Sequence, residues 1–373
     1  MALPGRATAE GTARYAARFV ASGAAVPGHF RGALGLTFSS IGYGTQIGGS
    51  TDEVDARYRL TLAEAIRHGC NVLDTASSYR AQRSEIVLGH ALAALVNRGE
   101  CRRDEVIVMS KGGFISYYLD APDDPVEHIY RHVVRPGIAE PDDLAGGIHC
   151  LTPDFLSQQI AFSLRNTQLR MIDLFFIQNP ETQLAFVDRA TFRRRMQLAF
   201  ARLEEEVASG RIGWYGVATW EGLRRPPVAS NYMSLENLLR LAAEVAGPHH
   251  HFRSVQLPVS VAMIEAATLR NQPVGNSLLT ALNAAQALGL TAFASAALGQ
   301  GQPVYRSVEP LAEAFPAISA HAQRMLQFAR SLPGVTTALF GSLQPDHVRD
   351  MMQLAAHPTA PRNALQVAQA LMR

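Results

Sequence analysis

The sequence predicts an α/β protein that folds as a closed (β/α)8 TIM barrel. Short β-branched or apolar runs alternate with segments of helical period, a pattern typical of βαβ units and a parallel sheet. Eight such units span about 300 residues, which matches the size of an eight-stranded barrel. The alternative, a doubly wound open sheet, would carry a G-x-G-x-x-G turn after its first strand. The glycines of GYGTQIGG at 42–49 lack that spacing, so the barrel is preferred.

The predicted strands and helices follow one another in regular order. The strands are the runs at 38–45, 71–76, 105–112, 171–178, 212–219, 252–259, 290–296 and 335–341. The helices between them show one apolar face each, with Val54, Tyr58, Leu62, Ala65 and Ile66 on one and Met196, Phe200, Leu203 and Val207 on another. Thr51 and Thr152 stand where helix N-caps are expected. We expect a helical extension at 1–33, the barrel at 34–356 and a C-terminal helix at 357–373.

Composition and charge exclude several classes of function. The chain has a net charge of +2, and its basic residues are scattered, so no nucleic-acid partner is predicted. No stretch reaches about 18 consecutive apolar residues, so no membrane span is predicted. The cysteines Cys70, Cys101 and Cys150 are too few for a disulfide framework and favour a cytoplasmic location. The adjacent histidines at 249–251 cannot all converge on one ion, so no metal site is predicted.

One connection is unusually long. It runs from Gly112 to Pro153, after the third strand, and loops of this length in a compact domain are usually functional or disordered. It carries the aromatic residues Phe114, Tyr117, Tyr118, His128, Tyr130 and His132, which disfavour disorder. Because a loop after a barrel strand lies on the catalytic face, we expect a lid or pocket wall over the C-terminal face.

Polar side chains stand at the ends of three consecutive strands. Asp74 and Tyr79 follow the second strand, Lys111 ends the third and Gln178 ends the fourth. Barrel chemistry is assembled from the carboxyl ends of several strands. Each residue also has a structural explanation, since Asp74 could cap a helix, Lys111 could lie on the surface and Tyr79 could be a pocket aromatic. Their occurrence together favours a shared chemical role.

The combination of tyrosine, lysine and aspartate predicts a general acid. A tyrosine with a reference pKa near 10 is a poor proton donor, and a nearby ammonium lowers that pKa. A carboxylate paired with Lys111 keeps the lysine charged and positioned, because an unpaired buried ammonium is costly. The expected product is a Tyr79 hydroxyl aimed at an oxygen that gains charge, as hydride addition to a carbonyl requires.

Several segments of the chain resemble the aldo-keto reductase superfamily, from about Leu34 to about Met352. The matching motifs are GYGT (42–45), LDTASSY (73–79) with SEIVLG (84–89), MSKGG (109–113), IDLFFIQNPE (172–181), GRIGWYGVATW (210–220) and LPGVTTALFGSLQPDHV (332–348). The resemblance implies a nicotinamide cofactor across the barrel mouth, with NADP(H) favoured and NAD(H) as the alternative. It also implies a small-molecule carbonyl (aldehyde or ketone) or alcohol substrate, and a sugar is one such substrate.

The resemblance assigns roles residue by residue. Asp74, Tyr79, Lys111 and Gln178 take the catalytic positions, with Tyr79 as general acid/base. Gln256 is placed to bond the nicotinamide carboxamide, Phe293 to stack on the ring, and residues 294–301 to wrap the pyrophosphate. The full set of implied cofactor contacts is Gly44, Thr45, Asp74, Thr219, Gln256, Phe293, Ser295, Leu298, Gly341, Ser342, Gln344 and His347.

This sequence departs from the family pattern at three places. Gln178 stands where the family usually has histidine, and the superfamily's potassium-channel β subunits carry asparagine there. Ala218-Thr219 replaces a Ser-Asn pair that helps hold the carboxamide. Gly341 and His347 replace the basic pair that grips a 2′-phosphate, which weakens the NADPH preference unless Arg349 folds back.

These departures leave other functions open. The main alternative is a cofactor-binding, weakly catalytic sensor or regulatory barrel, which Gln178 favours. A cofactor-free sugar-phosphate lyase or isomerase is a third, although it would leave the adenosine-end loop unexplained.

Overall fold

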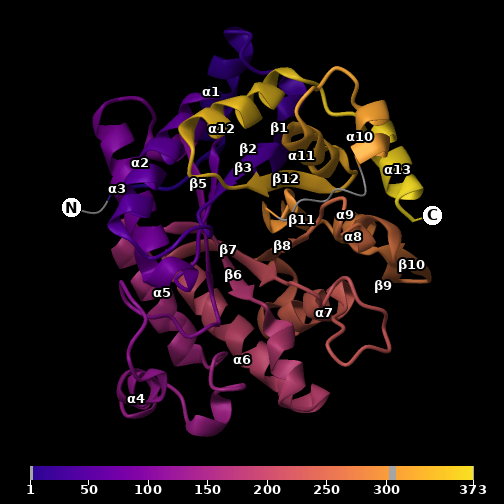
Figure 1. Ribbon diagram of the computed structural model, residues 1–373. Coiled ribbons are helices and arrows are strands. Elements are labelled where there is room, and N and C mark those ends of the chain that lie inside the picture. Colours follow the sequence, from indigo (N-terminus) through magenta and orange to yellow (C-terminus); the bar gives the residue numbers. More distant parts are fainter. Residues whose placement is uncertain (1–2, 302–307, 373) are drawn as a thin grey trace.

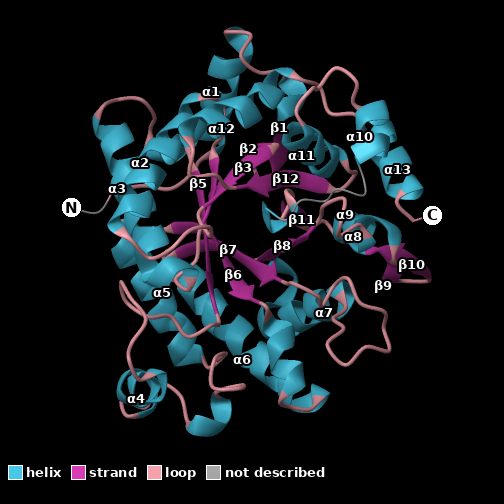
Figure 2. Ribbon diagram, viewed as in Figure 1, coloured by secondary structure: helices cyan, strands magenta, loops and turns pink. Residues whose placement is uncertain are grey.

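The computed structural model describes residues 3–301 and 308–372, and it contains the predicted closed barrel of parallel strands. In chain order the barrel strands are β3 (Ile41–Gly44), β4 (Val72–Asp74), β5 (Ile107–Gly112), β6 (Ile172–Gln178), β7 (Ile212–Ala218), β8 (Phe252–Pro258), β11 (Thr291–Ser295) and β12 (Val335–Phe340). The last strand pairs with the first, Ala338 opposite Ile41, which closes the ring. Figure 2 shows the strands at the centre and the helices around them.

The first predicted strand is wrong in one respect, because the run at 38–45 divides between two elements. Its beginning belongs to β2 (Leu36–Ser39), which pairs antiparallel with β1 (Phe30–Ala33) outside the barrel. Phe38 is fully buried in the barrel interior, with its ring centroid 5.8 Å from that of Phe293. The hairpin therefore lies outside the ring of strands but extends the side chains of Leu36 and Phe38 into the interior cluster. The run FSSIGYGT at 38–45 contains no proline or turn dipeptide that would reveal the break after Ser39.

Helices cover the outside of the barrel. The larger ones are α2 (Asp52–Arg67), α3 (Arg83–Asn97), α5 (Pro153–Thr167), α6 (Arg189–Ala208), α7 (Leu235–Ala246), α9 (Ala281–Ala287), α11 (His321–Ser331) and α12 (Pro345–Met352). The expected apolar faces are buried, as at Leu62 in α2 and Phe200 in α6. Thr51 caps α2 through its side chain, whereas Thr152 begins α5 without such a bond and donates instead to the Ile138 carbonyl, 3.0 Å away.

Further elements extend the barrel. They are α1 (Ala9–Ala21), α8 (Glu265–Thr268), the antiparallel hairpin β9 (Arg270–Val274) and β10 (Ser277–Thr280), α10 (Val308–Ala314) and α13 (Pro361–Ala370). Helix α13 packs against α10 and α11, beside the C-terminus in Figure 1. None of the described helices combines the length and the apolar composition that crossing a bilayer requires.

The alternation of side chains along the strands decides which residues reach the barrel mouth. On β5, Ile107 and Met109 belong to the interior cluster, and the next inward position is Lys111. On β6, Phe176 belongs to the same cluster and is followed inward by Gln178. Successive residues of a strand point to opposite faces, so the last inward position of each strand is presented at its carboxyl end. On β5 and β6 those positions are the polar residues Lys111 and Gln178.

The long connection after β5 is folded, but it does not cover the mouth as expected. It contains α4 (Pro125–Ile129) and a π-helical turn at 130–134, and Val133, Ala139 and Cys150 form a small apolar cluster with Phe155 of α5. Figure 1 places α4 at the edge of the molecule, away from the strands. A cavity opens at the carboxyl end of the barrel, and none of the described residues of this connection lines it. The expected pocket wall is therefore not seen.

Candidate active site

A cavity of about 620 Å³ opens at the carboxyl end of the barrel. All four catalytic candidates, Asp74, Tyr79, Lys111 and Gln178, line it, so the structure brings them together. Besides Asp74, six of the predicted cofactor contacts line it: Gly44, Thr219, Gln256, Ser295, Leu298 and Gly341. The cavity lies within the usual size range of ligand sites.

Asp74 and Lys111 form a buried ion pair at the base of this cavity. The Lys111 Nζ donates to both carboxylate oxygens of Asp74 across 2.7 Å and to the Thr75 carbonyl across 2.9 Å. Gln256 Nε2 donates to Asp74 Oδ1 across 2.9 Å. Burial lowers the pKa of Lys111, but the Asp74 carboxylate and the bond to Tyr79 outweigh it and hold that pKa above its usual value. The ammonium is therefore charged and fixed in place.

Tyr79 lies against this pair. The Lys111 Nζ is 4.7 Å from the centre of the Tyr79 ring. Burial raises the pKa of Tyr79, while the Lys111 charge lowers it and the Asp74 charge raises it, and the net pKa stands above its usual value. Lys111 thus lowers the pKa of Tyr79 as expected, although the effect of burial is larger. Tyr79 holds its proton at neutral pH, as a proton donor must.

Gln178 is oriented by two hydrogen bonds. The Ser78 hydroxyl donates to the Gln178 Oε1 across 2.8 Å, and the main-chain carbonyl of Gln178 lies 2.7 Å from the His149 Nε2. With its side-chain carbonyl engaged, the group that Gln178 offers to the cavity is its NH2, a neutral hydrogen-bond donor. The amide orientation is assigned from this bonding pattern.

His149 is a residue that the sequence did not reveal. It is fully buried in the connection after β5, and its Nδ1 lies 2.8 Å from the Gln183 Nε2. Because Gln183 can only donate through that nitrogen, the Nδ1 accepts and the Nε2 carries the proton that it donates to Gln178. Burial lowers the pKa of His149 to about 4, so the ring is neutral. No local motif marks this contact, since it joins a loop to a distant strand end.

The residues present fit a nicotinamide carboxamide. Thr219 is 4% exposed and lines the cavity, and its Oγ1 has no hydrogen-bond partner among the described residues. A buried hydroxyl without a partner is uncommon in folded proteins and is expected where a ligand completes the bonding. The Thr219 amide donates to the Gln256 carbonyl across 2.8 Å, which keeps the two residues adjacent. Of the pair Ala218-Thr219, Thr219 thus keeps one side-chain hydrogen-bonding group at the cavity, and Ala218 has none.

Phe293 does not take the ring-stacking position expected of it. It is fully buried in the barrel interior, with its ring 5.8 Å from that of Phe38 and 5.9 Å from that of Phe176. The residue of β11 that reaches the cavity is Ser295, two positions further along the strand. Phe293 is in register with Gln256, which lines the cavity, but its ring is enclosed by those of Phe38 and Phe176.

Trp220 is a cavity-lining aromatic residue that the sequence reasoning missed. It follows β7, and its backbone is held by the buried carboxylate of Glu181. The Glu181 Oε1 accepts hydrogen bonds from the amides of Trp220, Glu221 and Gly222 at 2.7, 2.9 and 3.2 Å. Three donors on one oxygen fix the loop after β7. The position of Trp220 in the cavity wall therefore depends on Glu181, which follows β6.

The remaining predicted cofactor contacts, Thr45 and those of the adenosine end, lie largely outside the cavity. Thr45 bonds the Asp74 carbonyl through its amide at 3.0 Å and its hydroxyl at 3.2 Å and does not line the cavity. Gly341 lines it, while Ser342, Gln344 and His347 lie beyond it around the start of α12. Arg349 bonds Glu64 at 3.2 Å and pairs with Asp346. It therefore does not fold back toward the cavity.

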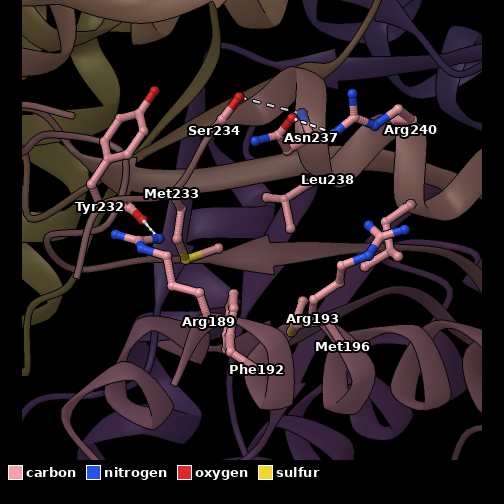
Figure 3. A pocket seen from close by; sticks show the side chains of 11 residues that line it. Arg189, Phe192, Arg193, Met196, Tyr232, Met233, Ser234, Asn237, Leu238 and Arg240 are labelled. Carbon is pink, nitrogen blue, oxygen red and sulfur yellow. Dashed lines mark hydrogen bonds between the residues drawn. The ribbon is translucent and has the colours of Figure 1, made fainter. Parts of the chain in front are cut away.

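A second cavity, of about 200 Å³, lies between α6 and α7 (Figure 3). Its floor is apolar, with Phe192 and Met196, and arginines lie at its edge. These arginines are already engaged: Arg189 donates to the Tyr232 carbonyl across 3.0 Å, and Arg193 pairs with Glu244. The cavity therefore presents little free charge, and we assign no ligand to it.

Comparison with known proteins agrees with this arrangement. A family model described as the aldo/keto reductase family matches residues 40–234, just over half of the chain. Comparison with curated protein sequences gave no match. An aldo/keto reductase from Klebsiella pneumoniae, solved with NADP and acetate, is similar with a TM-score of 0.61 and 19% identity, over 93% of this chain and 95% of that one.

Two further structures are similar. An aldo-keto reductase from Klebsiella pneumoniae with NADPH gives a TM-score of 0.60 and 18% identity, over 90% of this chain and 92% of that one. An aldo-keto reductase from Bacillus halodurans in its holo form gives 0.59 and 18%, over 92% and 95%. At these identities the similarity concerns the fold. The family model covers the catalytic candidates, whereas Gln256, Ser295 and Gly341 lie beyond its matched range.

Proposed function

The chain belongs to the aldo/keto reductase family of nicotinamide-dependent oxidoreductases, and on that premise we propose that it interconverts a small carbonyl compound and the corresponding alcohol. The observation that carries this proposal is the buried Asp74–Lys111 pair beneath Tyr79, at the wall of a cavity. A binding module has no need of a charged lysine placed against a protonated tyrosine. A tyrosine that acts as a general acid does need such a lysine, because the phenolate that it becomes must be stabilised.

The chain's own residues would carry the proton transfer. When bound, a reduced nicotinamide supplies the hydride that adds to the carbonyl carbon. As the carbonyl oxygen gains the electron pair of the C=O bond, the Tyr79 O–H bond breaks and its proton passes to that oxygen. Lys111 stabilises the resulting phenolate, and Asp74 keeps Lys111 charged and in place. The Gln178 NH2 donates to the same oxygen without altering its charge.

We propose NADP(H) as the cofactor, with NAD(H) as the alternative. In support, the similar Klebsiella proteins were solved with NADP and NADPH. Thr219 and Gln256 would hold the carboxamide, residues Ser295 and Leu298 would lie along the cofactor, and Gly341 would begin the adenosine end. The remaining predicted contacts at 342, 344 and 347 would complete that end.

The cavity wall also indicates the character of the substrate. Among the described lining residues the only charged side chains are Asp74 and Lys111, which neutralise each other. Gln46, Asn179 and Gln178 offer amides, and Trp220 offers an aromatic face. Uncharged, hydroxylated aldehydes or ketones match amide groups and an aromatic face better than anions do. We therefore propose a neutral, hydroxyl-bearing carbonyl substrate.

We infer a reducing compartment such as the cytoplasm for this activity. In support, Cys70, Cys101 and Cys150 are all unpaired. All three are buried, and burial raises the pKa of each thiol, which makes them unreactive core residues. Unpaired cysteines of this kind are typical of proteins kept in a reducing environment.

The test combines cofactor binding with turnover. Fluorescence titration with NADPH and NADH is expected to give a saturable signal, and a panel of neutral hydroxylated aldehydes and ketones is expected to include a substrate. Tyr79→Phe is expected to lower kcat about a hundredfold or more while cofactor affinity stays within a few-fold. Loss of less than about tenfold would mean that another group donates the proton.

The alternative function is a weakly catalytic barrel that senses the cofactor. The neutral Gln178 amide favours it, because it gives the site no imidazolium to assist the reaction. Saturable cofactor binding without turnover on any carbonyl would select this alternative. Absence of binding to either cofactor, from a folded sample, would remove both.

A further inference from the structure

The backbone that follows Tyr79 is held in an unusual conformation. Arg80, Ala81 and Gln82 have φ angles of +50°, +52° and +69°, all in the left-handed region. Residues other than glycine adopt this conformation at an energetic cost, and usually only one at a time. Three in succession persist only where surrounding contacts determine the conformation, and such strain is often found at functional sites.

The Arg80 side chain provides the main contacts. Its side chain is 1% exposed. The Nε donates to the Gly49 carbonyl across 2.9 Å, and the Nη2 donates to the Asp55 Oδ1 across 2.5 Å. The guanidinium also lies 5.0 Å from the centre of the Tyr58 ring. The charge, the Nε and Nη2 donors and the flat face of the guanidinium are therefore used, whereas the buried Nη1 has no hydrogen-bond partner among the described residues.

Neighbouring residues hold the rest of the turn without the Ala81 side chain. The Ala81 carbonyl accepts from the Leu119 amide across 2.8 Å. The Gln82 Oε1 accepts from the Asn166 Nδ2 across 2.9 Å. Ala81 thus contributes only backbone contacts, whereas Arg80 contributes a side-chain anchor one residue from the proposed general acid.

The anchor also joins two walls of the cavity. Gly49 lies just beyond Gln46 and Ile47, which line the cavity on the side of Gly44. The bond from Arg80 to Gly49 connects this segment to the turn that carries Tyr79. Asp55 connects the same turn to α2 and also accepts from the Arg83 Nη1 across 2.7 Å.

We propose that Arg80 is a positioning residue for catalysis. It fixes the strained turn so that the Tyr79 hydroxyl keeps its place beside Lys111 and toward the carbonyl oxygen. This inference rests on the proposed reductase function. Glycine at position 80 would satisfy the backbone without strain, so the backbone alone does not account for an arginine there. The contacts of its anchored side chain explain why an arginine stands at this position.

A matched pair of variants tests the proposal. Arg80→Gly and Ala81→Gly both relieve the cost of a positive φ, but only the first removes the anchor. For Arg80→Gly we expect kcat to fall about a hundredfold, as a misplaced catalytic group causes, while KM and the Kd for NADPH stay within a few-fold. For Ala81→Gly we expect unchanged kcat and a melting temperature at or above that of the wild type.

Rescue separates positioning from general support of the fold. Guanidinium ion, added far below denaturing concentrations, is expected to restore part of the kcat of Arg80→Gly and to leave that of Ala81→Gly unchanged. Arg80→Lys keeps the charge but loses the planar fork, so it is expected to lose kcat as Arg80→Gly does. Wild-type kcat in folded Arg80→Gly, or in Arg80→Lys where the glycine variant does not fold, would overturn the proposal.

Crystal structures of the two glycine variants provide a readout that does not depend on turnover. In Arg80→Gly we expect the Tyr79 ring to leave its position 4.7 Å from the Lys111 Nζ, and in Ala81→Gly we expect it to stay. A wild-type protein inactive on every carbonyl would sink the proposed function, while this comparison would still decide the role of Arg80. An unmoved Tyr79 ring in Arg80→Gly would contradict it.

Discussion

The hydroxyl of Ser78 donates a hydrogen bond to the side-chain carbonyl of Gln178 across 2.8 Å. This contact determines which end of the amide faces the cavity. With the carbonyl held, the NH2 points to the place where a substrate oxygen would lie, and it can donate a hydrogen bond but cannot ionise. Gln178 is thus suited to orient a carbonyl, whereas proton supply falls to Tyr79.

Gln178→Ala is expected to lower kcat/KM on the best substrate by about tenfold to a hundredfold, because it removes a donor to the oxygen that gains charge. Ser78→Ala is expected to lower it less, since the amide remains but is free to rotate. Steady-state kinetics of both variants measure the effect. Wild-type activity in Gln178→Ala would show that the amide only fills space.

Gln178→His is expected to raise or broaden carbonyl reduction. Histidine has a reference pKa near 6.5, so the variant would add an ionisable donor. The rate of the variant should therefore depend more strongly on pH between about 5 and 8 than that of the wild type. If both His and Ala at this position lose activity, the site is specialised for a neutral donor.

Asp74→Asn is expected to destabilise the fold and to lower kcat together. Removing the carboxylate leaves the Lys111 ammonium buried without a charged partner, which costs about 3–5 kcal/mol in comparable cases. Adding Lys111→Met to this variant should recover stability, because the unpaired charge is gone, but should not recover activity. Urea unfolding and kcat of the single and double variants measure the two effects. Recovery of activity in the double variant would exclude the proposed role of Lys111.

The strands and the charged pair were predictable because each depends on local pattern. Alternation along a strand shows which residues point inward, and a polar residue at the end of an inward series marks the mouth. Lys111 and Gln178 were found in this way. Phe293 was misplaced because the rings that enclose it, those of Phe38 and Phe176, come from distant segments of the chain.

The missed contacts join residues far apart in the chain. His149 supports Gln178 from a loop, and the carboxylate of Glu181 sets the backbone of Trp220. The break between β2 and β3 depends on a hairpin outside the ring of strands whose residues Leu36 and Phe38 enter the interior cluster. Such contacts depend on how the loops pack against the folded barrel. Neither periodicity nor motif spacing carries that information.

Arg349 offers a way to alter cofactor preference. It is held by Glu64 at 3.2 Å and by Asp346, so its charge is not offered to a ligand. The double variant Glu64→Gln, Asp346→Asn is expected to free the guanidinium and to raise NADPH affinity relative to NADH, because a guanidinium pairs strongly with phosphate. Adding Arg349→Ala should abolish the gain. Fluorescence titration measures both dissociation constants, and an unchanged ratio would place Arg349 out of reach of the cofactor.

His149 is expected to make stability depend on pH in the acid range. Burial lowers its pKa to about 4 in the folded protein, from about 6.5 in the unfolded chain. Between these values the unfolded chain binds a proton that the folded protein does not, so stability is full above about pH 6.5 and falls as the pH drops toward 4. The shift corresponds to about 3 kcal/mol at most. His29, whose pKa burial lowers to about 3, acts in the same direction.

The variant His149→Asn tests this dependence. It is expected to be less stable than the wild type at pH 7.5, because the bonds to Gln178 and Gln183 are lost or lengthened. Its stability should nevertheless fall less steeply between pH 6.5 and 4, with His29 accounting for the remainder. His90→Gln, at an exposed position on α3, serves as the control and should follow the wild-type curve. Urea unfolding at several pH values gives the free energies. Parallel curves for His149→Asn and the wild type would mean that His149 takes up its proton equally in the folded and the unfolded chain, in conflict with an Nδ1 that accepts from Gln183.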